Sequence, residues 1–211
     1  EFRRVLFRSQ KDAEEVAPLI HRAIGELADI LFNTSRKQKI HFFLTKLFQK
    51  DHTRVSHHFV DVAEVGGKIG GIAISYPGNV IKTINKPVLS FCKTLHQESN
   101  VIDTNVLPIL HAKEAEDDEY YLDTLAVNPN LTSNGIGTAL IKHIQKKAVK
   151  NGFSKTSLLV EKDNPNAFRL YNRLGYKNMG TVTLREIHYD KMVKFLPTIN
   201  TLAKSDVSCI G

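Results

Sequence analysis

Residues 120–152 read YYLDTLAVNPNLTSNGIGTALIKHIQKKAVKNG, and this stretch decides the fold. Residues 120–127 are rich in aromatic and β-branched side chains, which is typical of a strand, and residues 128–135 carry the Asn, Pro and Gly of a turn. The apolar side chains that follow recur every three or four residues, which predicts an amphipathic helix that ends at Asn151 and Gly152. This order of strand, turn and helix favours an α/β protein.

The turn before this helix is a candidate anion-binding site. Gly135 and Gly137 let the backbone approach a ligand closely, and the N–H groups at a helix N-terminus attract a phosphate or pyrophosphate. Side-chain donors lie beside them at Ser133, Asn134 and Thr138. Because turns before helices also carry glycine for backbone reasons alone, the two glycines do not establish a site by themselves.

Three kinds of phosphate ligand compete for such a turn. A nucleotide-binding P-loop needs Lys and then Ser or Thr after its glycines, but Thr138 and Ala139 follow Gly137, so ATP is disfavoured. A dinucleotide fingerprint needs a third small residue where Leu140 stands, although Glu161 ends the next predicted strand as that fold requires. A dinucleotide-binding oxidoreductase therefore stays open as an alternative to the pantetheine pyrophosphate of coenzyme A.

Outward from this stretch, the pattern predicts a single domain over residues 10–196. The further elements, in chain order within each class, are helices at 12–30, 40–48 and 164–174 and strands at 59–65, 68–76, 156–161, 176–184 and 188–195. Gly66 and Gly67 join the first two of these strands in a hairpin. Residues 79–119 lose the strand alternation and carry helical fragments before an acidic run, so we expect a helical insertion there, and residues 197–211 form a C-terminal tail.

The composition is that of a globular protein, because 42% of the 211 residues are hydrophobic and 24% are charged. Residues 1–9, EFRRVLFRS, match a translated sequencing adapter or a cloning remnant and are predicted to be a non-native artefact. Their three arginines and one glutamate account for +2 of the net charge of +7, which leaves +5. The remaining domain is only mildly basic.

Several other classes of protein lack support in the sequence. The lysines are scattered without interleaved aromatic residues, so no nucleic acid partner is predicted, and no apolar run reaches the roughly 20 residues of a membrane span. Cys92 and Cys209 show no metal or redox spacing, which favours a cytoplasmic location. The histidines, including His57 and His58, lack the spacing of zinc ligands, so no metal is predicted.

The stretch YYLDTLAVNPNLTSNGIGTALI resembles the acetyl-CoA motif of the GNAT superfamily of N-acetyltransferases, whose pattern Arg/Gln-x-x-Gly-x-Gly/Ala follows a strand. Thr132 stands at the Arg/Gln position, a departure that removes a long donor near the pyrophosphate. The later sequence NPNAFRLYNRLGY is similar to the family's second coenzyme-contacting element, with Asn164, Ala167 and Tyr171 at matching places. The resemblance implies the GNAT fold, with a mixed central sheet of about six to seven strands that splays at the coenzyme site between flanking helices.

In that family the pantetheine arm of acetyl-CoA enters the opening in the sheet as a surrogate strand. Splayed strands expose unpaired backbone groups, which an amide-bearing arm can satisfy. The residues implied to bind the coenzyme are Leu125, Ala126, Val127, Thr132, Ser133, Asn134, Gly135, Ile136, Gly137, Thr138, Asn164, Ala167 and Tyr171. For Asn164 the alternative role is that of a helix N-cap.

The family reaction is direct attack of an acceptor amine on the thioester in a ternary complex. It requires a neutral amine, a donor for the oxyanion and a proton for the departing thiolate. The resemblance places Tyr171 near the sulfur, where a phenol of pKa about 10 can protonate the thiolate, with packing on the sheet as the alternative. Asp123, which has the strand parity of Tyr121, Leu125 and Val127, is the candidate base, unless it pairs with a lysine. The backbone N–H of Leu125 is the implied oxyanion donor.

The acceptor is expected to be a primary amine of a small molecule or a peptide. The insertion borders the acceptor cleft in the family, and its acidic end at residues 114–119 either attracts a cationic acceptor or forms a solvated linker. The resemblance also implies a possible homodimer through the later strands. A non-catalytic acyl-CoA-binding module is the alternative function, because Thr132 replaces the usual Arg or Gln of the motif and the sequence does not identify the catalytic base.

Overall fold

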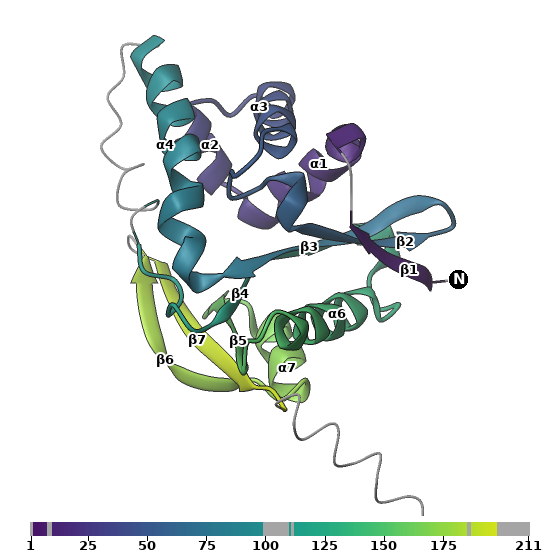
Figure 1. The fold of residues 1–211 in the computed structure, drawn as a ribbon. Coiled ribbons are helices and arrows are strands. Elements are labelled where there is room, and N and C mark those ends of the chain that lie inside the picture. Colours follow the sequence, from purple (N-terminus) through teal and green to yellow (C-terminus); the bar gives the residue numbers. More distant parts are fainter. Residues whose placement is uncertain (1, 8–9, 99–109, 111, 185–186, 198–211) are drawn as a thin grey trace, which may run out of the picture.

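A seven-stranded mixed sheet organises the chain, with the strand order β1-β2-β3-β4-β5-β7-β6 (Figure 1). The computed structural model describes residues 2–7, 10–98, 110, 112–184 and 187–197. The strands are β1 (Phe2–Phe7), β2 (Val60–Val65), β3 (Lys68–Pro77), β4 (Tyr120–Val127), β5 (Lys155–Glu161), β6 (Lys177–Leu184) and β7 (Ile187–Phe195). Strands β4 and β5 pair in parallel, and the other neighbours are antiparallel. The predicted mixed sheet is confirmed.

Helices cover both faces of this sheet. They are α1 (Ala13–Ile24), α2 (Leu27–Phe32), α3 (Lys37–Gln49) and α4 (Ile81–Glu98) on one face, and α6 (Ile136–Lys150) and α7 (Pro165–Arg173) on the other (Figure 1). Short 3₁₀ helices lie at η1 (Gln10–Asp12), η2 (His57–Phe59), η3 (Gly78–Val80) and η4 (Pro129–Leu131). The predicted helix over residues 12–30 is interrupted, because Gly25 adopts a positive φ of 53° that a helix cannot accommodate.

Each face of the sheet carries its own hydrophobic core. Ile20, Leu44 and Val62 belong to the core under α1–α4, whereas Leu140 and Leu158 belong to the core under α6 and α7. All of these side chains are at most 1% exposed. The core to which a buried side chain belongs therefore shows on which face of the sheet it lies.

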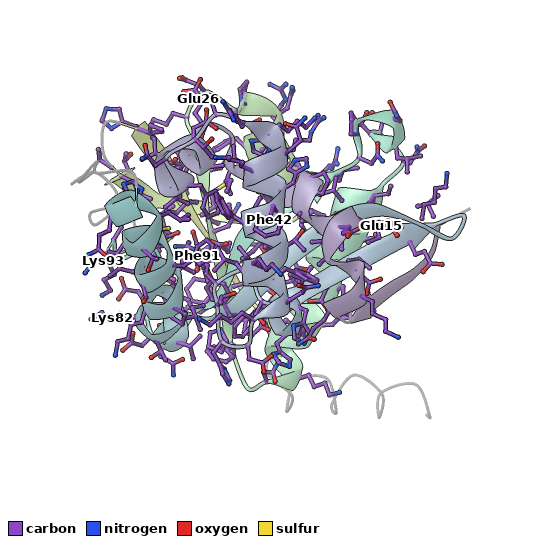
Figure 2. All side chains as sticks on the ribbon, turned by 90° about the horizontal axis from the view of Figure 1, so that it is seen from above. Glu15, Glu26, Phe42, Lys82, Phe91 and Lys93 are labelled. Carbon is purple, nitrogen blue, oxygen red and sulfur yellow. The ribbon has the colours of Figure 1, made fainter. Side chains whose placement is uncertain are left out.

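Helix α4 shows how the first core is closed from outside. Figure 2 shows Phe91 on the side of α4 that faces α3, while Lys82 and Lys93 project from the opposite side. The Phe91 ring packs edge to face on that of Phe43, with centroids 5.6 Å apart. A single amphipathic helix thus occupies the first part of the predicted insertion.

The hairpin of β2 and β3 turns at Gly66 and Gly67, as predicted, and β1 adds to its outer edge. An edge strand offers open hydrogen-bonding groups to any extended segment, so this pairing does not depend on where residues 1–9 originate. Their assignment as an artefact stays a prediction. Most of the predicted tail, residues 198–211, lies outside the described residues.

Candidate active site at the opening between β4 and β5

The opening in the sheet begins directly after the first residues of β4. Its parallel pairing with β5 consists of Tyr120 with Thr156 and Tyr121 with Ser157. From Leu122 onward, β4 stays paired with β3 on one edge but not with β5 on the other. An unpaired strand edge carries N–H and C=O groups that an extended ligand can satisfy.

The glycine turn leads from the end of β4 into α6. Gly135 has a φ of 74° and Ser133 a φ of 66°, so two left-handed residues bend the chain before the first turn of the helix. Gly135 is the N-cap residue of α6 and no described side chain caps the helix, so the N–H groups of its first turn, at residues 136–138, have no partner within the helix. Several N–H groups that converge at a helix N-terminus form a concave anion site.

Two polar side chains of this turn form hydrogen bonds within it. Thr132 Oγ1 donates to the Pro129 carbonyl at 3.1 Å, and Asn134 Nδ2 donates to the Leu131 carbonyl at 3.3 Å. Asn134, one of the three predicted side-chain donors, therefore braces the turn itself. The predicted donor roles of the Ser133 and Thr138 hydroxyls stay predictions.

Gly137 marks the point where three of the predicted site elements meet. A Cβ atom at this position would lie 3.7 Å from the Val127 side chain and 3.8 Å from those of Leu125 and Leu170. The start of α6, the end of β4 and the middle of α7 thus converge. The sequence motifs that the resemblance joins lie together in space.

Helix α7 places Asn164 and Tyr171 at different depths. Asn164 is the N-cap residue, and its Oδ1 accepts from the backbone N–H of Ala167 at 3.1 Å. Tyr171 is only 8% exposed and packs at 5.9 Å on the Tyr176 ring. Burial raises the pKa of the Tyr171 phenol well above its usual value, so the hydroxyl stays protonated at neutral pH.

A β-bulge in β4 sets the direction of Asp123. The register of β3 and β4 shifts between Ile74 and Ser75, and Asp123 is the residue of β4 that has no partner. Asp123 and Thr124 form a side-chain hydrogen bond, in which Thr124 Oγ1 donates to Asp123 Oδ2 at 3.1 Å. Both side chains consequently lie on one face of the strand.

The bulge overturns the predicted parity of this strand. Tyr121 belongs to the core under α1–α4, whereas Leu125 and Val127 pack against the core under α6 and α7. Asp123 contacts Arg54 on the α1–α4 face, so its predicted common face with Leu125 and Val127 is wrong. The extra residue inverts the alternation, which a strict period of two cannot anticipate.

Asp123 takes part in a buried cluster of charges. Arg54 Nε donates to Asp123 Oδ1 at 3.2 Å, and Arg54 Nη2 contacts both this oxygen and Glu114 Oε2, the latter at 2.5 Å. Tyr121 Oη also donates to Glu114 Oε2, at 2.9 Å. Burial alone would lower the pKa of the Arg54 guanidinium, but the carboxylates of Asp123 and Glu114 raise it well above its usual value. Asp123 therefore pairs with an arginine, and not with a lysine as the alternative prediction had it.

Three other residues of the acidic run, Glu116, Asp118 and Glu119, pair with lysines. Lys155 pairs with Asp118 at 2.8 Å, and Lys191 lies 3.1 Å from Glu119. Glu116 pairs with Lys113 at 2.5 Å. Glu114 and Glu119 are both buried, and Glu114 is the residue of the run that joins the cluster around Arg54.

Sequence reasoning missed Arg54 altogether. It lies between α3 and η2 in a segment without periodicity, and no motif singles it out. Glu114 was included only as one of five acidic residues. In the sequence, Glu114 differs from the other four acidic residues only in position, because Ala115 separates it from the contiguous residues 116–119.

The histidine-rich segment near Arg54 contains a group of possible metal ligands. Asp51, His57 and His58 each have a ligand atom within 4.8 Å of the others. Asp51 and His58 are exposed and His57 is half-buried, and His58 Nδ1 lies 3.5 Å from Asp51 Oδ1. The absence of a metal stays a prediction.

The cysteines and the membrane-span prediction can also be compared with the structure. Cys92 is a buried free cysteine whose pKa is raised to about 12 by burial, and Cys209 lies outside the described residues. Among the described helices, none combines the length and the apolar character that crossing a membrane would require.

A splayed sheet beside a phosphate-binding turn is the arrangement of an acyl-coenzyme A-binding fold. Residues 24–176 match the sequence model of the Acetyltransferase (GNAT) family. The chain belongs to this family, and the resemblance stated from its motifs is confirmed.

Individual relatives agree with this assignment. Over 65 residues the chain is 35% identical to an acetyltransferase of Pectobacterium atrosepticum and 32% identical to one of Yersinia enterocolitica. Each match covers 31% of this chain and 44% of the relative. The chain thus spans less than half the length of the curated relatives it matches.

Solved structures match the fold over most of the chain. An acetyltransferase structure gives a TM-score of 0.73 at 23% identity and covers 92% of this chain and 100% of its own. An N-acetyltransferase from Staphylococcus aureus gives 0.71 at 22% identity, covering 90% of this chain and 100% of its own. These similarities confirm the predicted GNAT fold.

Proposed function

We propose that the protein is an N-acetyltransferase that transfers an acetyl group from acetyl-CoA to a primary amine by direct attack in a ternary complex. The observation that carries this proposal is the opening between β4 and β5 beside the turn at residues 133–137. Together they offer a strand edge for pantetheine and N–H donors for the pyrophosphate. Family membership supports acetyl-CoA as cosubstrate, and one fold neighbour, an N-acetyltransferase of Thermoplasma acidophilum, was solved with coenzyme A.

The proposed coenzyme site relies mainly on backbone groups. The main chain of Leu125, Ala126 and Val127 would bond the pantetheine arm, because the edge of β4 is unpaired there. The N–H groups from Ser133 to Thr138, including those of Ile136 and the two glycines, would hold the pyrophosphate. With Thr132 bonded inside the turn, its position contributes no long donor, so the backbone has to suffice.

The proposed chemistry uses one group to stabilise the oxyanion and another to protonate the leaving thiolate. The Leu125 N–H would donate to the oxyanion, and Tyr171 would protonate the departing thiolate. The Tyr171 phenol carries a proton at neutral pH, as a general acid must, and burial raises its pKa further, which makes it a weaker acid. The base function is proposed for the carboxylate cluster around Asp123.

The acceptor is proposed to be cationic, because Asp123 and Glu114 share one guanidinium on the α1–α4 face. A homodimer through the later strands and a cytoplasmic location stay predictions. The non-catalytic acyl-CoA-binding module and the dinucleotide oxidoreductase are the outcomes that the tests separate from acetyl transfer.

The first test compares ligands by thermal unfolding. Acetyl-CoA at 100 times its dissociation constant is expected to stabilise the protein by about 2.7 kcal/mol, whereas NADH and ATP leave the melting temperature unchanged. Stabilisation by NADH alone would replace the acetyltransferase with the oxidoreductase. If acetyl-CoA stabilised the protein but no amine of a broad panel led to release of free CoA thiol, the protein would be a non-catalytic acyl-CoA-binding module.

The second test probes Tyr171. Replacing Tyr171→Phe is expected to lower kcat by about 100-fold with acetyl-CoA binding unchanged, because only the proton donor is removed. Tyr176→Phe is the matched control, since this ring packs on Tyr171 and its hydroxyl is already used as the acceptor of a hydrogen bond from Thr156 Oγ1 at 3.0 Å. Full turnover of Tyr171→Phe would remove the acid role and leave the fold assignment intact.

A further inference from the structure

The cluster of Arg54, Asp123 and Glu114 is not balanced in charge. Two carboxylates share one guanidinium, and the three side chains are 14%, 9% and 8% exposed respectively. An excess negative charge that is withdrawn from water is unfavourable unless a cation compensates it. Within the described part of the chain, no second cationic side chain pairs with either carboxylate.

A count of hydrogen bonds identifies one unused carboxylate oxygen. Both oxygens of Asp123 accept, one from Arg54 and the other from Thr124. Glu114 Oε2 accepts from Arg54 and from Tyr121. Among the described residues, none donates to Glu114 Oε1.

The unused oxygen belongs to a residue held at the start of the opening. Tyr121, which donates to Glu114, is also the residue of β4 that makes the last pair with β5, opposite Ser157. The side chains of Ser157 and Tyr76 are fully buried, and their hydroxyls have no hydrogen-bond partner among the described residues. The Tyr76 ring lies 6.0 Å from the ring of Tyr121, which donates to Glu114, so Tyr76 stands beside the cluster.

We propose that Glu114, held in place by Arg54 and Tyr121, binds the ammonium group of the acceptor and takes its proton before acetyl transfer. This inference rests on the proposed function and deepens it. The acceptor class is a primary amine that arrives as a cation, which supplies the charge that the cluster lacks. Asp123 then acts through Arg54, as a positioning residue.

The proton transfers balance over one turnover. The ammonium gives one proton to Glu114 Oε1, and the neutral nitrogen attacks the thioester carbonyl carbon, forming the C–N bond. Collapse breaks the C–S bond, and the thiolate takes its proton from Tyr171. The second nitrogen proton returns to Tyr171, and Glu114 releases the first proton to water, so the products are the amide, CoA thiol and one proton.

Few other groups near Glu114 change charge in the working pH range. Burial raises the pKa of the phenols of Tyr76 and Tyr121 well above their usual value, and it raises the pKa of Tyr189 on β7 to about 12. These phenols are neutral at neutral pH, and Arg54 stays cationic. In the described part of the chain, the charged groups that share the cluster with Glu114 are Arg54 and Asp123.

The experiment compares Glu114→Gln with Glu116→Gln, a variant of the same acidic run. Glu116 has a side chain that is 48% exposed and pairs with Lys113 at the surface. Steady-state rates with the best amine of the panel are measured from pH 6 to pH 9.5, together with the thermal shift by acetyl-CoA. We expect Glu114→Gln to lower kcat/KM at pH 7 by about 100-fold, a loss that shrinks toward high pH where the amine is already neutral. Glu116→Gln is expected to stay within about twofold of the unmodified protein.

A second variant guards against failure of Glu114→Gln to fold. Tyr121→Phe removes the hydroxyl that orients Glu114, so it is expected to raise the KM for the amine about tenfold and to change the pH profile, with an unchanged acetyl-CoA shift. A wild-type pH profile and kcat/KM in Glu114→Gln, or in Tyr121→Phe if only that variant folds, would overturn the role of Glu114. If instead the unmodified protein released no CoA with any amine, the proposed function itself would fail.

Discussion

Two buried carboxylate sites lie on opposite faces of the same sheet and differ in their balance of charge. On the α6 face, Asp61 of β2 is fully buried and is met by Lys147 Nζ at 2.7 Å and His143 Nε2 at 3.2 Å. On the α1–α4 face, Asp123 and Glu114 share Arg54. The first site matches one carboxylate with a lysine and a histidine, whereas in the second site two carboxylates share one guanidinium.

The difference separates a structural ion pair from a candidate binding site. Asp61 ties α6 to the sheet with its charge compensated, and nothing about it requires a ligand. The Arg54 cluster retains an excess negative charge and an unused oxygen, which a protein optimised for stability alone would not keep. Substitutions at the two sites are therefore expected to act in different ways.

The largest effect is expected from Arg54→Met, which replaces the guanidinium by an apolar side chain of similar length. Both carboxylates lose their counter-charge while remaining buried, so the free energy of unfolding is expected to fall by about 3–5 kcal/mol. Urea unfolding followed by circular dichroism measures this. Adding Glu114→Gln to Arg54→Met is expected to recover part of the loss, because one of the two stranded charges disappears. Strict additivity of the two substitutions would contradict a shared cluster.

On the α6 face, Asp61→Asn is expected to cost about 2–3 kcal/mol of unfolding free energy. The amide keeps the shape of the carboxylate but takes its charge away from Lys147, whose side chain is 13% exposed. The same urea titration measures the loss, and acetyl-CoA binding to the folded variant is expected to be unchanged. A loss below about 0.5 kcal/mol would mean that this site does not hold α6 to the sheet.

A smaller effect is expected from Thr124→Val, which keeps the shape of the bulge residue and removes its hydrogen bond to Asp123. The cost in unfolding free energy is expected to be about 1 kcal/mol, as for a typical intramolecular hydrogen bond. Thr124→Ser is the matched control, because it keeps the hydroxyl that donates to Asp123 and removes only the methyl group. Equal costs for the two variants would assign the effect to packing.

The sequence predicted most of the fold because the fold depends on local patterns. The strand, turn and helix of residues 120–152, the glycine hairpin and the second coenzyme element all carry signals within a few residues of one another. Gly135 and Gly137 could be placed at the turn before α6 for the same reason. The break between α1 and α2 at Gly25 was not predicted, because the apolar period continues across it.

The acidic cluster could not be predicted in the same way. Arg54 lies 69 residues from Asp123 in the sequence, and only the folded chain brings them together. The bulge is a matter of register between β3 and β4, which a strict alternation along β4 alone does not reveal. Sequence reasoning thus selected Asp123 but assigned it to the wrong face.

The smallest effect on stability is expected from Glu114→Gln, and it is the sharpest test of the comparison. Both Asp61→Asn and Glu114→Gln exchange a buried carboxylate for an amide of the same shape. At Glu114 the amide oxygen can still accept from Arg54 and Tyr121, and the cluster becomes neutral, so the unfolding free energy is expected to stay within about 0.5 kcal/mol of the unmodified protein or to rise. The same substitution is expected to impair amine turnover. A loss of stability as large as that of Asp61→Asn would mean that Glu114 is retained to hold the fold, and a gain in stability with reduced turnover would mean that it is retained to bind the acceptor.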